Sequence, residues 1–387
     1  MGLADGAWRD PLGGAADLRD RRLRLCSPEA IRDDPIRALR AVRFSLDLGL
    51  RIDPEAARAL RAAAGGLGSA SAERVRDEVF RLLALEAPAS AVRLLDELAC
   101  LQAVFPEVDA LHGIEQPAPH AYDAWNHTLA VVDGMRTVLR CLAPGGESDG
   151  AGDLVLAEAR LHLGAYAPAL RAHVQGAHTE ARPHSSLLVF DALYHDAGKA
   201  VTRLVDGRGA VRFLGHEAVS AELAVERARS LRLTGEEVER IGTAIAQHMR
   251  PGQLEKAQPI SRRSLYRYFR DCGAAGIDVL LLSLADLLGK STPPVAPERW
   301  RMRLTAVRQL LESYFDHPAE HLHPALLVDG DDLMSRLQLG PGPEIGRLLE
   351  ALREAQAAGE ISTREQALDL AAALHHGPPE GPRLRMD

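Results

Sequence analysis

The feature that most constrains the fold is the recurrence of Leu, Val and Ala at helical spacing along nearly the whole chain. Hydrophobic residues make up 46% of the 387 residues, whereas aromatic residues make up only 4%. Ala, Leu, Arg and Glu, which are frequent throughout, favour the helical state. Aliphatic residues three and four positions apart share one face of a helix. The sequence therefore predicts an all-α protein with an aliphatic core.

One short segment near the N-terminus departs from the helical pattern. Residues 22–25, Arg-Leu-Arg-Leu, alternate as a strand does. A single strand is not stable alone, and we expect no second strand in this chain. The segment is therefore interpreted as part of a sheet that the chain does not otherwise contain.

Length, charge and cysteine content narrow the class of protein. A chain of 387 residues can form two or three domains with a sizeable core. The formal net charge of −8 does not mark a nucleic-acid binder, so such a role depends on local basic patches. No apolar run reaches about 18 residues, and the N-terminus has no apolar signal core, which predicts a cytoplasmic protein without membrane contact. The distant cysteines indicate reduced thiols: Cys26, Cys100, Cys141 and Cys272.

An ordered set of histidines and aspartates gives the strongest functional signal. His195 and Asp196 are adjacent, so an imidazole and a carboxylate stand at one point on the backbone. This pair alone would arise by chance among 15 histidines and 54 acidic residues. Mixed imidazole and carboxylate ligands favour Mn, Fe, Ni, Co or Mg over a structural zinc, which prefers thiolates. The residues that complete the ordered set are His127, His216, His248 and Asp286.

The order His…His-Asp…His…His…Asp resembles the HD superfamily of metal-dependent phosphohydrolases. The resemblance implies one divalent metal bound by four residues: His127, His195, Asp196 and Asp286. His216 and His248 would bind either a second metal or the substrate phosphate. Lys199 and Arg203 lie in a Gly-Lys-x-x-Thr-Arg arrangement and would hold a phosphate. The catalytic group would then comprise His195, Asp196, Lys199 and Arg203. The alternative is a set of unrelated histidines on separate helices.

Three segments in the N-terminal part carry a second pattern. Asp33-Asp-Pro-Ile-Arg37 follows Asp10-Pro-Leu-Gly-Gly14, and Ser71-Ala-Glu-Arg-Val-Arg-Asp-Glu78 comes later. These segments resemble the head-to-neck passage of bacterial class II tRNA nucleotidyltransferases and poly(A) polymerases. The resemblance implies that four residues bind the incoming nucleotide, the first two by reading its Watson–Crick edge: Asp34, Arg37, Glu73 and Arg74. The alternative is a helix N-terminus with acidic residues near its positive end and a solvated arginine stripe.

The same resemblance implies a nucleotidyltransferase head with an aspartate pair for two Mg²⁺, and no such motif precedes Asp10. Gly68-Ser69 and Asp329-Gly-Asp-Asp332 lack the required context. We therefore expect a family member without its head, of which residues 1–25 are a remnant. A truncated gene, a wrong start codon and a split enzyme with a separate head subunit all stay open.

The motifs divide the remaining chain into three expected parts. Residues 26–110 form a helical neck that binds nucleotides and RNA, and residues 111–300 form the HD-type domain. Residues 301–387 form a small helical tail that resembles the tail of HD-containing bacterial enzymes. An insert is expected over residues 144–185, and its histidines are interpreted as surface residues: His173, His178 and His184.

Ser261–Arg270 is the best local candidate for RNA contact. Its arginines fall on one helical face: Arg263, Arg267 and Arg270. Tyr266 and Tyr268 are available to stack on bases. The alternative is a solvated helix face that packs through Leu265 and Phe269.

Two functions follow from these patterns. The first is an RNA-processing protein of the tRNA nucleotidyltransferase and poly(A) polymerase family. It would bind tRNA 3′ ends and hydrolyse phosphomonoesters or 2′,3′-cyclic phosphates at a metal-dependent HD site. The second is a non-catalytic RNA-binding body, or the partner half of a split CCA-adding or poly(A)-adding enzyme. The intact histidine and aspartate set favours the first, and the base-reading neck motif favours the second.

Overall fold

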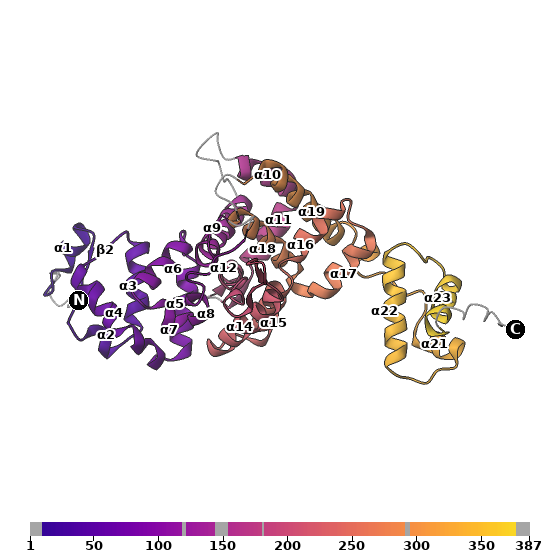
Figure 1. The fold of residues 1–387 in the computed structure, drawn as a ribbon, viewed down its shortest axis with the longest axis horizontal. Coiled ribbons are helices and arrows are strands. Elements are labelled where there is room, and N and C mark those ends of the chain that lie inside the picture. Colours follow the sequence, from indigo (N-terminus) through magenta and orange to yellow (C-terminus); the bar gives the residue numbers. More distant parts are fainter. Residues whose placement is uncertain (1–9, 118–120, 144–153, 180–181, 291–294, 377–387) are drawn as a thin grey trace, which may run out of the picture. The chain divides into compact units, whose positions relative to one another are not determined.

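The computed structural model describes residues 10–117, 121–143, 154–179, 182–290 and 295–376, and for residues 177–179 the backbone alone (Figure 1). Helices make up 71% and strands 3%, which confirms the all-α class. The chain forms two compact units. The first unit comprises Met1–Met249 and Ile277–Arg301, and the second unit comprises Arg250–Gly276 and Met302–Asp387. Residues 250–276, within the predicted HD range, thus belong to the second unit. The domain boundaries at residues 25, 110 and 300 stay predictions.

The N-terminal part of the first unit consists mainly of short helices around aliphatic side chains. Leu39, Val79 and Leu95, from three of these helices, are at most 1% exposed. The elements are α1 (Gly14–Arg19), β1 (Arg22–Leu23), α2 (Ala30–Asp33), α3 (Arg37–Asp47), β2 (Arg51–Ile52), α4 (Pro54–Ala63), the 3₁₀ helix η1 (Ala64–Ser69), α5 (Ala72–Leu83), α6 (Pro88–Glu97), α7 (Leu101–Val104) and α8 (Pro106–Asp109).

The predicted strand has a partner within this chain. β1 pairs in parallel with β2, so that Arg22 aligns with Arg51 and Leu23 with Ile52. The expectation that residues 22–25 lack a strand partner here is therefore wrong. Two-residue strands are too short to show alternation in the sequence, which is why β2 was not predicted. The strand gives no indication of a missing sheet.

The rest of the first unit is a bundle of longer helices. In it α12 packs against α9, and α14 packs against α15 (Figure 1). The elements are α9 (Ala124–Leu142), α10 (Leu154–Leu163), η2 (Gly164–Tyr166), α11 (Ala167–Gln175), β3 (Ala177–Thr179), β4 (Arg182–Pro183), α12 (His184–Tyr194), α13 (Lys199–Thr202), β5 (Arg203–Val205), β6 (Val211–Phe213), α14 (His216–Ser230), α15 (Gly235–Ala246) and α18 (Gly276–Gly289).

α9 and α18 approach each other closely because a glycine stands at their contact. A Cβ atom on Gly289 would lie 2.8 Å from the backbone nitrogen of Val131, closer than real Cβ contacts allow. The backbone of α18 therefore lies directly against α9 at the turn after His127. The start of α9 is fixed by Asp123, whose side chain accepts a hydrogen bond from the backbone N–H of Asn126.

The second unit combines helices from two parts of the chain. Its C-terminal helices surround a small core in which Leu333, Leu348 and Leu352 are at most 2% exposed. Asp329 and Asp332 form a capping box at the start of α21. The elements are α16 (Arg250–Leu254), η3 (Glu255–Ala257), α17 (Arg262–Cys272), η4 (Gly273–Ala275), α20 (Pro318–His321), α21 (Gly330–Leu337), α22 (Pro343–Ala357), α23 (Arg364–His376) and most of α19 (Pro297–Phe315).

One helical stretch, Arg262–Gly289, is long and apolar enough to cross a membrane by length and composition, although Asp278 and Asp286 interrupt its apolar run. The stretch comprises α17, η4 and α18. Of its most apolar window, 83% is buried inside the protein. Burial in the core therefore explains its apolar character.

Candidate metal centre

The six predicted metal ligands lie together in the first unit. They come from α9, the end of α12, the start of α14, the end of α15 and α18, and none is more than 9% exposed. The residues are His127, His195, Asp196, His216, His248 and Asp286. The predicted ligands, spread over 160 positions of sequence, thus form one buried cluster.

On one side of the cluster, two imidazoles and two carboxylates face one another. Oδ2 of Asp196 lies 3.2 Å from Nε2 of His127 and 3.1 Å from Nε2 of His195. Oδ1 of Asp286 lies 3.4 Å and 3.8 Å from the same two nitrogens. The Nε2 atoms of His127 and His195 are 3.3 Å apart.

The other oxygen of Asp196 faces the remaining two histidines. Its Oδ1 atom lies 3.1 Å from Nε2 of His216 and 3.9 Å from Nε2 of His248. The cluster therefore has two halves, and the carboxylate of Asp196 is common to both.

Backbone carbonyls orient all four imidazoles. Each Nδ1 atom lies 2.7 to 3.1 Å from a carbonyl oxygen, to which only a protonated Nδ1 can donate. In a neutral imidazole this leaves the lone pair on Nε2, the atom that points into the cluster. The carbonyls that accept these hydrogen bonds belong to Gly289, Ala192, Phe213 and Ile245, for His127, His195, His216 and His248 in turn.

The pKa values indicate that both carboxylates of the cluster are ionised. Burial opposes ionisation of Asp196 and Asp286, but neighbouring histidines and lysines outweigh it and hold both pKa values well below the usual range. Burial would lower the pKa of His127, yet hydrogen bonds to the two carboxylates raise it. Burial and the charge of His195 lower the pKa of His248 to about 3, so this imidazole is neutral near neutral pH.

These residues fit a divalent cation. Two imidazole Nε2 atoms 3.3 Å apart converge with ionised carboxylate oxygens, which is a donor set that a divalent cation binds. The hydrogen bonds to the backbone are of the kind that orients metal-binding histidines. The donor set contains no thiolate, which agrees with Mn, Fe, Ni, Co or Mg rather than a structural zinc.

A second glycine lets α14 approach the His195–Asp196 turn. A Cβ atom on Gly198 would lie 2.5 Å from the carbonyl oxygen of His216 and 2.7 Å from the backbone nitrogen of Ser220. The N–H of Gly198 donates to Oγ of Ser220 at 2.8 Å. This close contact places His216, the first residue of α14, next to the carboxylate of Asp196.

A cavity of about 190 Å³ opens beside the cluster, and lysines stand at both carboxylates. Nζ of Lys199 lies 2.5 Å from Oδ2 of Asp196 and donates to Oε1 of Gln116 at 2.5 Å. Lys290 pairs with Asp286. The cavity is lined by Gln116, Pro117, Asp196, Lys199, Val211, Arg212, Phe213, His216, His248, Met249, Asp286 and Lys290.

Two features of this cavity differ from the sequence-based prediction. Arg203 is exposed in β5 and does not line the cavity, although it was predicted to hold a phosphate. Lys290, which was not predicted, does line it. Its position four residues after Asp286, one helical turn, was the available signal.

The interpretation of His173 and His184 as surface residues is wrong. His184 is 3% exposed, and the side chain of His173 is 17% exposed. Their Nε2 atoms lie 2.6 Å and 2.8 Å from Oδ1 of Asp278, which Arg240 also contacts. Nearby Asp191 is 2% exposed, and its Oδ1 atom has no hydrogen-bond partner. His178 lies in β3, and its side chain is outside the described residues.

In the neck region, three of the four predicted nucleotide-binding residues lie together. Oδ2 of Asp34 accepts from Arg74 at 2.8 Å and lies 3.8 Å from Nε of Arg37. Glu73 is exposed in the first turn of α5. Glu78, only 2% exposed, accepts from three arginines at 2.8 to 3.2 Å: Arg40, Arg43 and Arg81.

The predicted RNA-contact arginines on α17 are held by glutamates of α22. Glu354 lies 3.2 Å from Arg263, 2.6 Å from Arg267 and 3.2 Å from Arg270. The three guanidinium groups are 37 to 50% exposed. Tyr268 is fully buried and Tyr266 is 2% exposed, so the prediction that they are available to stack on bases is wrong for both.

Three family models match the chain. Residues 49–111 match the model described as the probable RNA and SrmB-binding site of polymerase A. Residues 155–288 match the HD domain, and residues 243–372 match the putative domain 2 of tRNA nucleotidyltransferase. His127 lies before the HD match, so α9 contributes it from outside that segment.

Curated relatives align over nearly the whole chain. The A-adding tRNA nucleotidyltransferase of Deinococcus radiodurans is 30% identical over 365 residues, which are 92% of this chain and 72% of the relative. The CC-adding tRNA nucleotidyltransferase of Thermus thermophilus is 32% identical over 361 residues, 92% of this chain and 70% of the relative.

Solved structures of CCA-adding enzymes share the fold. An apo form has a TM-score of 0.51 at 16% identity, and a complex with CTP has a TM-score of 0.51 at 15% identity. They cover 94% and 95% of this chain. The chain in turn spans only 65% and 66% of their length.

Proposed function

The chain belongs to the tRNA nucleotidyltransferase family, and from this premise we propose that it binds tRNA and hydrolyses small phosphoesters at an HD-type metal centre. The substrates would be phosphomonoesters or 2′,3′-cyclic phosphates of nucleotides, as at RNA ends. The observation that carries the proposal is the convergence of four imidazole Nε2 atoms on the two oxygens of Asp196.

The size of the cavity supports small substrates. About 190 Å³ is below the usual range of about 300–1,000 Å³ for ligand pockets, so it suits a phosphate and part of a sugar. Lys199 and Lys290 line this cavity and carry positive charge toward it. Arg212 adds a guanidinium at the rim, where its side chain is 60% exposed. These cations would bind the phosphate and offset the charge that builds on its oxygens during reaction.

The two halves of the cluster suggest how the ligands divide between two metal ions. His127, His195 and Asp286 would hold one metal with Oδ2 of Asp196, and His216 and His248 would hold a second with Oδ1. A divalent ion such as Mn, Ni, Co, Fe or Mg supplies a Lewis acid and lowers the pKa of water. The backbone carbonyls keep the imidazoles in the tautomer that this binding needs.

The neck region supports binding of nucleotides and of tRNA 3′ ends. Asp34, Arg37 and Arg74 offer a carboxylate and guanidinium groups at one place, the donors and acceptors that a base edge requires. Glu73 lies one residue before Arg74 and would assist them. Glu73 and Arg74 lie within residues 49–111, which match an RNA-binding family model, whereas Asp34 and Arg37 precede that match.

The test compares Asp196→Ala with the wild-type protein. We expect the variant to lose bound metal, measured by mass spectrometry of the dialysed protein, together with turnover of an aryl phosphodiester and of 2′,3′-cyclic nucleotides. The helical circular-dichroism signal should stay nearly unchanged. Glu222→Ala, which changes an exposed carboxylate on α14, is the control. Full metal content and turnover in Asp196→Ala would refute the proposal.

The second candidate function is a non-catalytic RNA-binding body that acts with a separate nucleotidyltransferase head subunit. The base-reading cluster of Asp34, Arg37 and Arg74 favours it, because incoming nucleotides have no evident role in hydrolysis. The pure chain should then not incorporate labelled ATP or CTP into tRNA lacking its 3′ end, since two-metal transfer needs an aspartate pair that the separate head subunit would supply. Mg²⁺-dependent incorporation by the pure chain would contradict this reading.

A further inference from the structure

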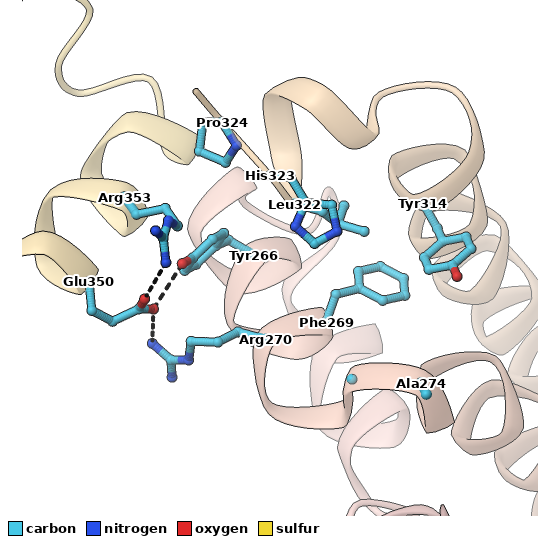
Figure 2. A pocket seen from close by; sticks show the side chains of 11 residues that line it. Tyr266, Phe269, Arg270, Ala274, Tyr314, Leu322, His323, Pro324, Glu350 and Arg353 are labelled. Carbon is cyan, nitrogen blue, oxygen red and sulfur yellow. Dashed lines mark hydrogen bonds and ion pairs between the residues drawn. The ribbon is translucent and has the colours of Figure 1, made fainter. Parts of the chain in front are cut away.

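The second unit contains a cavity of about 700 Å³ that none of the predicted metal ligands lines. It lies between α17 with the turn that follows, the end of α19, residues 322–324, and α22 (Figure 2). Its volume is typical of sites that bind small molecules, which range over about 300–1,000 Å³.

One side of this cavity is lined by two aromatic rings. The rings of Phe269 and Tyr314 lie 5.1 Å apart with an angle of 38° between their planes. In Figure 2 both rings lie on the side away from Glu350. The turn beside them borders open space, since no atom lies within 4 Å of the place where a Cβ on Gly273 would stand. Aromatic rings around an open space favour a planar ligand.

The opposite side presents one carboxylate between two guanidinium groups. Glu350 accepts from the hydroxyl of Tyr266 at 2.8 Å and from Arg353 at 3.3 Å, and it lies 3.6 Å from Arg270 (Figure 2). The hydroxyl of the buried tyrosine fixes the position of the carboxylate. A ligand on this side of the cavity would face one hydrogen-bond acceptor, Glu350, with a donor on each side, Arg353 and Arg270.

Stability does not account for this arrangement. Glu350, Arg353 and Arg270 are each 37% exposed, and exposed ion pairs contribute little to folding. A carboxylate has about four acceptor positions, so Glu350 can accept from a ligand while it keeps its hydrogen bond from Tyr266. Glu350 and Arg353 can thus exchange a protein partner for a ligand. Arg270 also donates to Asp271 at 2.7 Å and to Glu354 at 3.2 Å.

Among the nucleobases, guanine best matches this pattern. Its N1–H and N2–H₂ groups are adjacent donors that suit the two oxygens of a carboxylate, and its O6 and N7 atoms accept from arginine. Adenine offers one amino group beside an acceptor, and uracil offers one N–H between two carbonyls. Only guanine presents two adjacent donors and two further acceptors.

We propose that this cavity binds a guanine base, with Glu350 as its acceptor and Arg353 or Arg270 as its donor. The base could come from a free nucleotide or from an unpaired residue of RNA, since both present the same edge. The site is independent of the phosphohydrolase proposed above, because its residues belong to a different unit of the protein.

The experiment measures the affinities of GMP, AMP, CMP and UMP for the full chain by calorimetry in EDTA, which disables any metal-dependent hydrolysis. We expect GMP to bind about tenfold more tightly than AMP, the effect of one well-matched charged pair. Glu350→Gln should abolish this preference. Glu344→Gln is the matched control on the same helix, because Glu344 pairs with Arg347 and does not line the cavity, and it should keep the preference.

Two hairpin RNAs that differ only by guanine or adenine in the loop identify the source of the base. A preference for the guanine hairpin assigns the site to RNA, and a preference confined to GMP assigns it to a free nucleotide. Equal affinity for all four nucleotides, or an unchanged preference in Glu350→Gln, would overturn the proposal. Turnover at the HD-type centre should not change in Glu350→Gln, so the two proposals fail separately.

Discussion

Oδ1 of Asp196 lies 3.1 Å from Nε2 of His216, while Oδ2 of the same carboxylate faces His127 and His195. One aspartate thus connects two groups of imidazoles. Loss of His216 should affect one half of the cluster, whereas loss of Asp196 should affect both.

We therefore expect His216→Ala to reduce the bound metal from about two ions to about one per chain and Asp196→Ala to remove both, because the aspartate alone serves both sites. Metal content per chain is measured after dialysis against each of Mn²⁺, Co²⁺ and Ni²⁺. His162→Ala, a histidine on α10 outside the cluster, is the control. Equal metal loss in the His216 and Asp196 variants would contradict the two-site arrangement.

Lys290→Met should raise KM for phosphoester substrates about tenfold and leave the metal content unchanged, because the lysine faces the cavity but donates no lone pair to a metal. Steady-state kinetics with a cyclic nucleotide measures this effect. Arg203→Met, assayed in parallel, should have a smaller effect, since Arg203 is exposed outside the cavity. A larger effect at Arg203 would favour the sequence-based assignment.

Glu354→Gln should increase the affinity for tRNA about threefold to tenfold and steepen its dependence on salt. The substitution removes the carboxylate that Arg263, Arg267 and Arg270 share, so that they can pair with phosphates and release counterions more readily. Arg263 keeps its contact with Glu360, and Arg270 keeps its contact with Asp271. Fluorescence anisotropy of labelled tRNA at several salt concentrations measures both quantities. Conversely, Arg263→Glu with Arg267→Glu should weaken binding. If neither substitution changes the affinity, this helix face does not contact RNA.

Asp191→Asn should stabilise the protein at neutral pH. Burial, then the charge of Asp278, raises the pKa of Asp191 well above its usual value. A carboxyl whose pKa is raised by folding destabilises the folded state increasingly as pH rises above the unfolded pKa of about 3.9. The neutral amide removes this cost.

Thermal unfolding of the wild type and of Asp191→Asn between pH 4 and pH 8 tests the prediction. The variant should melt higher than the wild type by about 2–4 °C at pH 7.5, the shift expected for ~1 kcal/mol, and the difference should shrink toward pH 4. Asp206→Asn, on the partly exposed turn between β5 and β6, is the control. A difference that grows toward acid pH would contradict the assignment of a raised pKa.

The sequence by itself determined the helical class and the identity of the residues in the candidate metal centre. Helical periodicity is local, so it is readable wherever aliphatic residues repeat. His195 and Asp196 are covalent neighbours, and the order of the other histidines and Asp286 resembled a known family. The neck motif around Asp34 and Arg37 was recognised in the same way.

Only the tertiary structure decided which distant side chains become partners. Periodicity reports that a residue faces the core but does not say what it meets there. The sequence therefore gave no sign that His184 pairs with Asp278, 94 positions later, or that Glu354 holds the arginines of α17. The burial of Tyr268 and the pairing of β1 with β2 depend likewise on packing between segments far apart in the chain. The position of Asp196 between two groups of imidazoles also depends on packing between distant segments. Gly198 allows α14 to approach the turn that carries Asp196, and Gly289 allows α18 to approach α9.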